Sequence, residues 1–187
     1  MEKIKQFLKN LINITDDEMH LLLKDSCVKN FKRSDIIAKS HQIPNEIYFV
    51  NSGIIRLFLF DNDGVEHTKY FALENQFIVD YSSFILKKKA HYALQALEPT
   101  EVVVLPRSSV EWGYQKLNEG QKLGRLIAEY YFIYQDNKIK DEYTKSPKER
   151  YEGITSVFPE IINRVPQHMI ASYLGITSVH LSRLKKS

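Results

Sequence analysis

Hydrophobic residues at the amino end recur every three and four positions. Ile4, Leu8 and Ile12 fall on one face of a helix at this spacing. Thr15 is followed three residues later by Glu18, and this pair is typical of a capping box that begins a second helix through Met19, Leu22 and Leu23. The pattern therefore predicts two short leading helices.

From Val28 the pattern changes to short β-branched and aromatic runs separated by turns. The runs are 35–39, 46–50, 53–60, 65–71, 91–97 and 100–105. The turn 61–64 (Asp-Asn-Asp-Gly) favours a hairpin, because these residues tolerate positive φ. About eight short strands with close turns indicate a β-barrel or jelly roll. We place this domain at residues 1–106.

A helical pattern returns after the strands. Ser108 and Glu111 have capping-box spacing, and a long helix is predicted after Gly120. Its large side chains alternate between spacings of four and three, which is typical of a contact between two helices. The predicted seam consists of Leu123, Ile127, Tyr130, Tyr134 and Asn137. We expect residues 107–145 to form a dimerisation helix with a hinge near 141–145; the alternative is a helix that lies on its own barrel.

The last segment, 146–187, has the pattern of a helix-turn-helix. Ser146 and Pro147 favour a new helix start, and Pro159 and Pro166 punctuate two further short helices. Two apolar stripes then flank Gly175, which can adopt the left-handed backbone that ends a helix, and Thr177 can cap the next helix. The alternative is an ordinary helical hairpin.

Charge favours nucleic acid as the partner of this segment. The whole chain has a formal charge of only +3, but residues 161–187 contain no Asp or Glu. Arg183 can form a bidentate pair with guanine, whereas Thr177, Gln167 and Lys185 are expected on phosphates. The candidate DNA-contacting residues are Gln167, Thr177, Ser178, Val179, His180, Ser182, Arg183, Lys185 and Lys186.

Composition argues against three classes of protein: membrane proteins, metalloproteins and enzymes. With 43% hydrophobic and 26% charged residues the chain has an ordinary soluble balance, and no apolar run approaches the roughly 20 residues needed to cross a bilayer. We expect a cytoplasmic protein that does not contact the membrane. Cys27 is the one cysteine, and the histidines lack metal-ligand spacing. We therefore expect no metal, no cofactor and no enzymatic activity.

The Gly-Ile-Thr and Leu-Ser-Arg-Leu run at 175–184 resembles the helix-turn-helix of the Crp/Fnr (cyclic-AMP receptor protein/FNR) superfamily. The order of strands, the Asn-Ser-Gly turn at 51–53 and the hairpin at 61–64 resemble the cyclic-nucleotide-binding fold of the same family. The resemblance implies an α+β protein with an N-terminal cyclic-nucleotide-binding-like β-barrel (jelly roll), a long dimerisation helix and a C-terminal helix-turn-helix. Few residues follow Leu184, so we expect little or no wing.

The resemblance also implies a pocket that has degenerated. Family members that bind cyclic AMP hold it with a Gly-Glu pair and an Arg-Ser pair, and here Val79-Asp80 and Ala90-His91 stand in those places. Without the glycine and the arginine we do not expect cyclic AMP to bind. Lys87, Lys88 and Lys89 either attract another anion or form a solvated loop. The possible effector pocket consists of Phe71, Phe77, Val79, Asp80, Tyr81, Ala90, His91 and Tyr92.

The sequence as a whole predicts a homodimeric, sequence-specific DNA-binding transcriptional regulator that reads a palindromic operator in double-stranded DNA. RNA polymerase and an unknown small-molecule effector are further candidate partners. The alternative is a barrel-based ligand-sensing or cupin-like metal protein whose C-terminal domain binds protein rather than DNA.

Overall fold

The computed structural model describes residues 1–185. The two leading helices are α1 (Glu2–Leu11) and α2 (Asp16–Leu23). The predicted capping box is confirmed, because Thr15 Oγ1 accepts from the Glu18 N–H at 3.2 Å and the Glu18 carboxylate accepts from the Thr15 N–H at 3.0 Å. Ile4, Leu8 and Ile12 are buried against the first sheet, so the amphipathic spacing has its expected cause.

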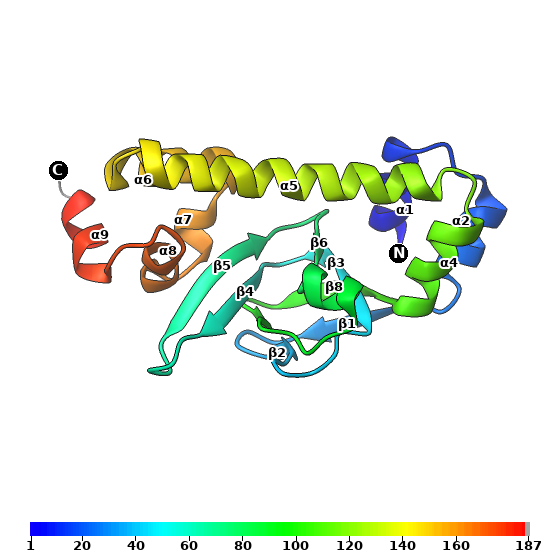
Figure 1. The fold of residues 1–187 in the computed structure, drawn as a ribbon, viewed down its shortest axis with the longest axis horizontal. Helices are drawn as coiled ribbons and strands as arrows, with labels where there is room; N and C mark the ends of the chain where they lie inside the picture. Colours follow the sequence, from blue (N-terminus) through cyan, green and yellow to red (C-terminus); the bar gives the residue numbers. More distant parts are fainter. Residues whose placement is uncertain (186–187) are drawn as a thin grey trace.

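Eight strands form two antiparallel sheets (Figure 1). Their bounds are β1 (Cys27–Phe31), β2 (Ile36–Ala38), β3 (Glu46–Ser52), β4 (Ile55–Phe60), β5 (Glu66–Ala72), β6 (Phe77–Ile78), β7 (Ala93–Ala96) and β8 (Thr100–Pro106). One sheet has the order β1-β8-β3-β6 and the other β2-β7-β4-β5. The predicted jelly roll is confirmed as two four-stranded sheets rather than a closed barrel.

Two glycine turns fix the ends of β4. Gly53 has a φ of 92°, and a Cβ atom there would lie 2.4 Å from Thr100 Oγ1, so the turn between β3 and β4 requires glycine. Gly64 has a φ of 77° and closes the β4–β5 hairpin, where the Asp61 carboxylate accepts from the Asp63 and Val65 N–H groups. The predicted hairpin therefore forms at the residues that favoured it.

Three helices follow the strands or interrupt them: α3 (Tyr81–Leu86), α4 (Arg107–Lys116) and α5 (Gly120–Thr144). The capping box predicted at Ser108 is wrong, because α4 begins directly after Pro106 and Ser108 lies inside its first turn. Helix α5 continues to Thr144, so most of the predicted hinge at 141–145 is helical. The break in the chain is confined to Lys145 and Ser146.

The C-terminal helices are α6 (Pro147–Val157), α7 (Ile161–Arg164), α8 (Gln167–Tyr173) and α9 (Ser178–Leu184). Ser146 caps α6, because its hydroxyl accepts from the Glu149 N–H and the Glu149 carboxylate accepts from the Ser146 N–H, as the sequence predicted. In Figure 1 these helices gather at the far end of α5, and α8 lies beside β5.

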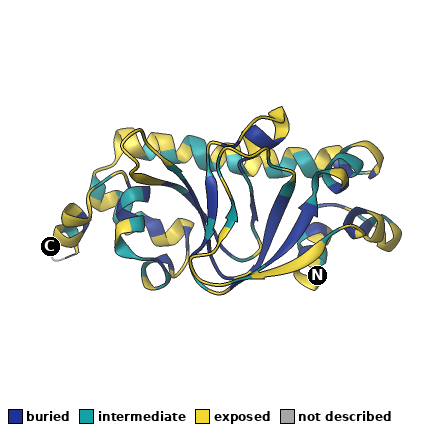
Figure 2. Ribbon diagram, turned by 90° about the horizontal axis from the view of Figure 1, so that it is seen from below, coloured by how far each residue is buried: buried dark blue, intermediate teal, exposed yellow. Residues whose placement is uncertain are grey.

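The C-terminal helices share a hydrophobic core with the β-domain. Phe71 of β5 contacts Phe158 and Tyr173, with ring centroids 5.8 and 5.5 Å apart. Figure 2 shows the buried residues concentrated on the strands and on the inner faces of the surrounding helices. The ranges 1–106, 107–145 and 146–187 remain our sequence-based division, but side-chain packing is continuous from the β-domain into the last four helices.

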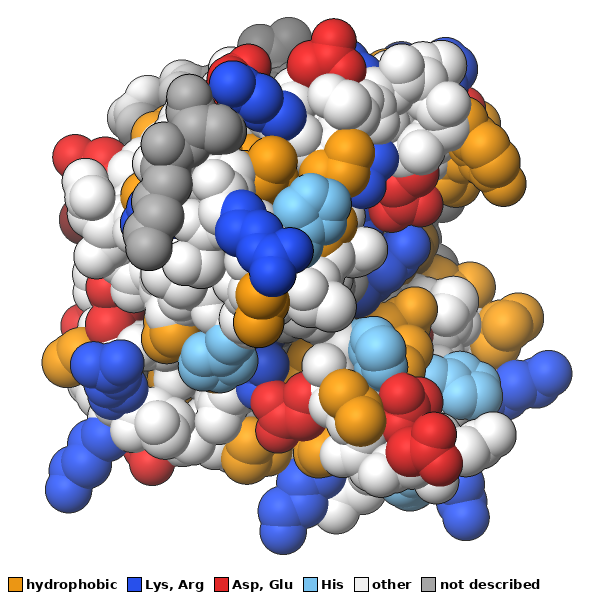
Figure 3. Space-filling view, turned by 90° about the vertical axis from the view of Figure 1, so that its left-hand side faces the viewer, with side chains coloured by type: hydrophobic (Ala, Val, Ile, Leu, Met, Phe, Trp, Pro, Cys, Tyr) orange, Lys and Arg blue, Asp and Glu red, His pale blue; other side chains and the backbone are white. Residues whose placement is uncertain are grey.

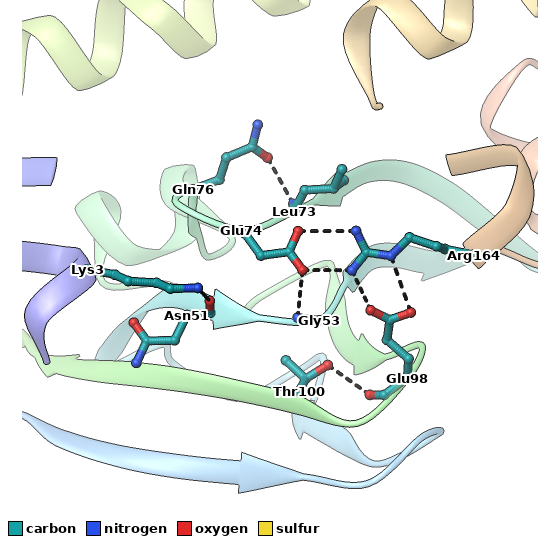
Figure 4. A network of polar contacts seen from close by, with 9 residues as sticks. All are labelled: Lys3, Asn51, Gly53, Leu73, Glu74, Gln76, Glu98, Thr100 and Arg164. Carbon is teal, nitrogen blue, oxygen red and sulfur yellow. Dashed lines mark hydrogen bonds and ion pairs between the residues drawn. The ribbon is translucent and has the colours of Figure 1, made fainter. Parts of the chain in front are cut away.

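One arginine adds an ionic contact across this junction (Figure 4). The Arg164 guanidinium, at the end of α7, donates to Glu74 at 2.7 Å and also to Glu98. Glu74 lies in the turn after β5 and Glu98 in the turn before β8, so one side chain joins two turns of the β-domain to the C-terminal helices.

Candidate nucleic-acid interface and effector cavity

The helix-turn-helix is built from a small buried face and a tight turn. Ile170, Ala171 and Leu181 are buried where α8 and α9 meet, and Ala171 supplies the small side chain that the close contact needs. Gly175 adopts a φ of 69°, and the following Ile176 N–H bonds to the Ala171 carbonyl at 3.0 Å. Thr177 Oγ1 then accepts from the His180 N–H at 3.1 Å and caps α9.

The outward face of α9 is exposed to solvent. All predicted DNA-contacting residues on it are exposed: Ser178, Val179, His180, Ser182, Arg183 and Lys185. Lys186 lies outside the described residues. Gln167, at the start of α8, is half-buried, and its side-chain oxygen accepts from Lys185 Nζ at 3.2 Å. The structure thus brings Gln167 and Lys185 together.

Figure 3 views the molecule from the end that carries the last helices. Lysine, arginine and histidine side chains are spread over this end, with carboxylates among them. The described part of the segment from Ile161 onward contributes no acidic side chain, so the carboxylates come from other elements. A polyanion approaching α9 itself meets only neutral or basic groups.

Most residues of the predicted seam on α5 pack against other parts of the same chain. Leu123 and Ile127 pack against the core formed with α1 and α2, and the Tyr134 hydroxyl bonds to the Tyr173 hydroxyl at 2.7 Å. Tyr130 and Asn137 are exposed. A second apolar stripe, outside the predicted seam, lies on the opposite face of α5. Its members are Phe132, Ile139 and Tyr143, and Phe132 and Tyr143 are 73% and 85% exposed.

Two neighbouring cavities occupy the predicted pocket. The first, of about 490 Å³, lies between the sheets and helices α4 and α5; Phe77, Val79, Asp80, Tyr81 and Tyr92 line it. The second, of about 370 Å³, includes Ala90 and shares Val79, Asp80 and Tyr92 with the first. Six of the eight predicted pocket residues therefore meet around these two spaces.

Two of the predicted pocket residues, Phe71 and His91, do not line either described cavity. Phe71 is completely buried under Phe158 and Tyr173 of the C-terminal helices, so it belongs to the core and not to a cavity wall. His91 is exposed, and neither described cavity includes its side chain. Both predictions named a residue on the correct strand or loop, but the side chain points away from the cavity.

Asp80 lines both cavities, but its carboxylate is hydrogen-bonded to the protein backbone. It caps α3 through the Ser83 N–H at 3.2 Å, and its second oxygen accepts from the His91 and Tyr92 N–H groups at 2.9 and 3.3 Å. Burial alone would raise the pKa of Asp80, but these N–H donors outweigh it and hold the pKa below its usual value. The carboxylate is therefore ionised and already occupied.

The cavity also has walls that the sequence analysis did not name. Lys69, Tyr114, Tyr131 and Gln135 line the larger space. The Tyr131 hydroxyl donates to the Phe77 carbonyl and so ties α5 to β6, and the Tyr81 and Tyr114 hydroxyls lie 3.2 Å apart. These residues come from different elements, and no short motif connects them in the sequence.

Other chemistry is sparse in the part of the chain described. Within residues 1–185, no cluster of three or more His, Cys, Asp or Glu side chains is arranged to hold a metal ion. Cys27 is exposed and forms no disulfide. None of the described helices combines the length and apolar character required to cross a bilayer.

Comparison with known proteins gives one family match and many structures of the same fold. The Cyclic nucleotide-binding domain family matches residues 28–116. No curated protein matches the chain in sequence. Among solved structures, FixK2 from Bradyrhizobium japonicum aligns with a TM-score of 0.72 and 17% identity over 86% of this chain and 83% of its own.

Two further structures agree with that alignment. A protein from Eubacterium rectale, described as a regulator of the Crp/Fnr family, aligns with a TM-score of 0.73 and 16% identity over 96% of this chain and 84% of its own. The c-di-GMP-responsive global regulator CLP from Xanthomonas campestris aligns with a TM-score of 0.69 and 13% identity over 90% and 88%. Residues 28–116 thus match the Cyclic nucleotide-binding domain family, and the chain as a whole shares the fold of these three solved structures, one of which is described as a regulator of the Crp/Fnr family.

Proposed function

We propose that the protein is a sequence-specific DNA-binding transcriptional regulator of the Crp/Fnr type, acting in the cytoplasm. The observation that carries this proposal is helix α9. Thr177 caps it, Leu181 anchors it, and every predicted contact residue on its outer side faces solvent without a neighbouring acid in the same segment. A helix presented in this way suits a major groove.

Each side chain on this face has a distinct proposed role. Arg183 alone can form a bidentate pair with guanine O6 and N7, so it would dominate sequence preference, with Ser178 and Val179 beside it on base edges. Thr177 and the Gln167–Lys185 pair would contact phosphates and position the helix without specifying sequence.

The proposed regulator acts as a homodimer through the outer face of α5. Phe132, Ile139 and Tyr143 lie on one side of this helix at spacings of seven and four, and each is at least half exposed. A two-fold contact along this stripe leaves Leu123, Ile127 and Tyr134 on the chain's own core, and Tyr130 and Asn137 lie on the same side of α5 as those three residues. Two such subunits imply a palindromic site with half-sites about 10 base pairs apart, centre to centre.

Cyclic AMP is not the proposed effector. Asp80 is committed to three backbone N–H groups, and Ala90 offers a methyl group where a cyclic phosphate needs an arginine. Calorimetry with cyclic AMP should therefore show no binding at micromolar concentration. A micromolar dissociation constant would contradict the claim that Asp80 and Ala90 cannot hold a cyclic phosphate.

Selection from a random pool of duplex DNA tests the proposal as a whole. The purified protein should enrich a palindromic motif, and Arg183→Ala should enrich a shorter or weaker one. Failure of the wild-type protein to enrich any motif would contradict a DNA-binding function.

A further inference from the structure

Lys69 occupies an irregular position in β5. Leu57 pairs with Tyr70 and Phe58 pairs with Thr68, so Lys69 has no partner across the β4–β5 pair and forms a bulge. A bulge re-aims the extra side chain, and bulges are frequent beside binding sites. Here Lys69 is half-buried and reaches the wall of the larger cavity.

The cavity surrounding Lys69 is otherwise almost wholly apolar or neutral. Among its described lining residues Lys69 is the one basic side chain, and Asp80 is the one acid. Asp80 already accepts from three backbone N–H groups. No carboxylate among residues 1–185 forms an ion pair with Lys69. Its ammonium is therefore available to a negatively charged group that enters the cavity.

A second lysine, Lys138, does not line the cavity but lies close enough for its charge to interact with that of Lys69. Gln135 lines the cavity, and Lys138 follows it by one helical turn on α5. The Lys138 side chain is only 13% exposed, and its ammonium lies 4.5 Å from the centre of the Tyr173 ring. Glu142 is its carboxylate partner, at 3.5 Å.

The charge of Lys69 acts on Lys138. Burial, and then the positive charge of Lys69, lower the pKa of Lys138, and Arg150 acts in the same direction. Glu142 offsets these effects only in part. The junction of β5, α5 and α8 thus holds an excess of positive charge beside an apolar space.

We propose that the larger cavity binds a small amphipathic acid, with its apolar chain or ring between the sheets and α5 and its acidic head against Lys69, where the nearby charge of Lys138 adds to the attraction. The apolar body would contact Leu57, Ile127 and Tyr131, which line the cavity. The negative head would reduce the repulsion between the two lysines. Because the Lys138 ammonium packs on the Tyr173 ring, this change in charge would also act on α8 of the helix-turn-helix. This inference goes beyond the proposed DNA-binding function, because the binding of the acid does not require DNA.

Decanoate and decanol form a matched pair of probes, because they share an apolar chain and differ in the charge of the head. Calorimetry on the full chain should show decanoate binding at least about tenfold more tightly than decanol. Lys69→Met and Lys138→Met keep an apolar stem but remove the charge, so each should reduce this preference while leaving decanol binding unchanged. Lys24→Met, on an exposed residue after α2, is the control and should behave as wild type.

Equal affinity for the two probes, or a preference that survives Lys69→Met, would overturn the inference, as would failure of wild-type protein to bind decanoate at millimolar concentration. Titration of Lys69→Met against the selected operator, without either probe, separates the two proposals. If Lys69→Met loses the preference for decanoate but binds the operator normally, both the acid-binding proposal and the regulator proposal are supported. If the wild-type protein binds decanoate but no operator, only the regulator proposal is contradicted.

Discussion

At the scale of single residues, a group of buried tyrosines joins α5 to the C-terminal helices. Burial raises the pKa of Tyr134 far above its usual value and the pKa of Tyr173 to about 12, and Tyr70 and Tyr131 are shifted in the same direction by the same cause. These hydroxyls are protonated at neutral pH, and the Tyr134–Tyr173 hydrogen bond of 2.7 Å requires a proton on at least one of them.

These shifts predict how stability depends on alkaline pH. Because the folded pKa values exceed the unfolded value of 10.0, the contribution to stability is complete below pH 10 and is lost as the pH rises above it. Tyrosinate absorbance should therefore rise in two steps, the exposed tyrosines first and the buried ones only as circular dichroism reports unfolding. A single step involving all 11 tyrosines before any loss of structure would contradict this.

Residues whose roles are local could be predicted, and residues whose roles depend on distant packing could not. The caps at Thr15, Ser146 and Thr177 act within three residues, so the sequence pattern contains all of the information. Phe71 was assigned to the pocket because it belongs to the right strand, but Phe158 and Tyr173, far along the chain, cover it. Lys69 was missed because a bulge does not show in the pattern of alternation.

At the scale of elements, α5 shows the limit of hydrophobic spacing. The stripe Leu123–Ile127–Tyr134 has the periodicity of an interhelical seam, but a helix packed on its own domain produces the same periodicity. Only the second stripe, on the opposite face, lacks a partner among the described residues. A helix with apolar residues on two faces contacts more than one neighbour, and the structure shows which stripe is already used.

The exposed stripe gives a prediction for assembly. Phe132→Glu combined with Tyr143→Glu should convert a dimer to monomers, because both charges would be buried as like-charge pairs across a two-fold axis. Sedimentation at micromolar concentration measures the outcome. Ser108→Glu with Gln115→Glu adds the same charge to exposed positions of α4 and should leave the dimer intact. A double α5 variant that sediments as wild type would place the interface elsewhere.

The contact of Arg164 with Glu74 and Glu98 gives a second prediction at this scale. Burial alone would raise the pKa of Glu74, but hydrogen bonds from Arg164 and the Gly53 N–H outweigh it, so this carboxylate is ionised at neutral pH. Arg164→Gln leaves two partly buried carboxylates without their cation and should lower the free energy of unfolding by about 1–2 kcal/mol.

Urea unfolding of Arg164→Gln measures this loss, and Arg125→Gln is the matched control. Arg125 also forms an ion pair, with Glu129 at 2.7 Å, but both side chains are largely exposed. Its replacement should change the unfolding midpoint very little. Equal effects of the two substitutions would show that the Arg164 contact does not hold the C-terminal helices to the β-domain.

At the scale of the whole molecule, the α+β architecture followed from the order of patterns: two leading helices, short strands with glycine turns, a long helix and a capped helix-turn-helix. The packing of α8 along β5 did not follow, because the hydrogen bond from the Thr68 N–H to Ser172 Oγ at 2.9 Å joins residues far apart in the chain. The sequence therefore predicted the elements and their order, but it did not predict how closely the C-terminal helices associate with the β-domain.

The central claim, that α9 reads a DNA sequence through Arg183, is tested most directly by titrating protein against the selected operator and a scrambled duplex at several salt concentrations. Arg183→Ala should lose about 1–3 kcal/mol of discrimination between the duplexes. Lys185→Ala should weaken both equally and reduce the salt slope by about one unit. A wild-type protein that binds both duplexes with the same affinity, or an Arg183→Ala variant that retains full discrimination, would contradict the account.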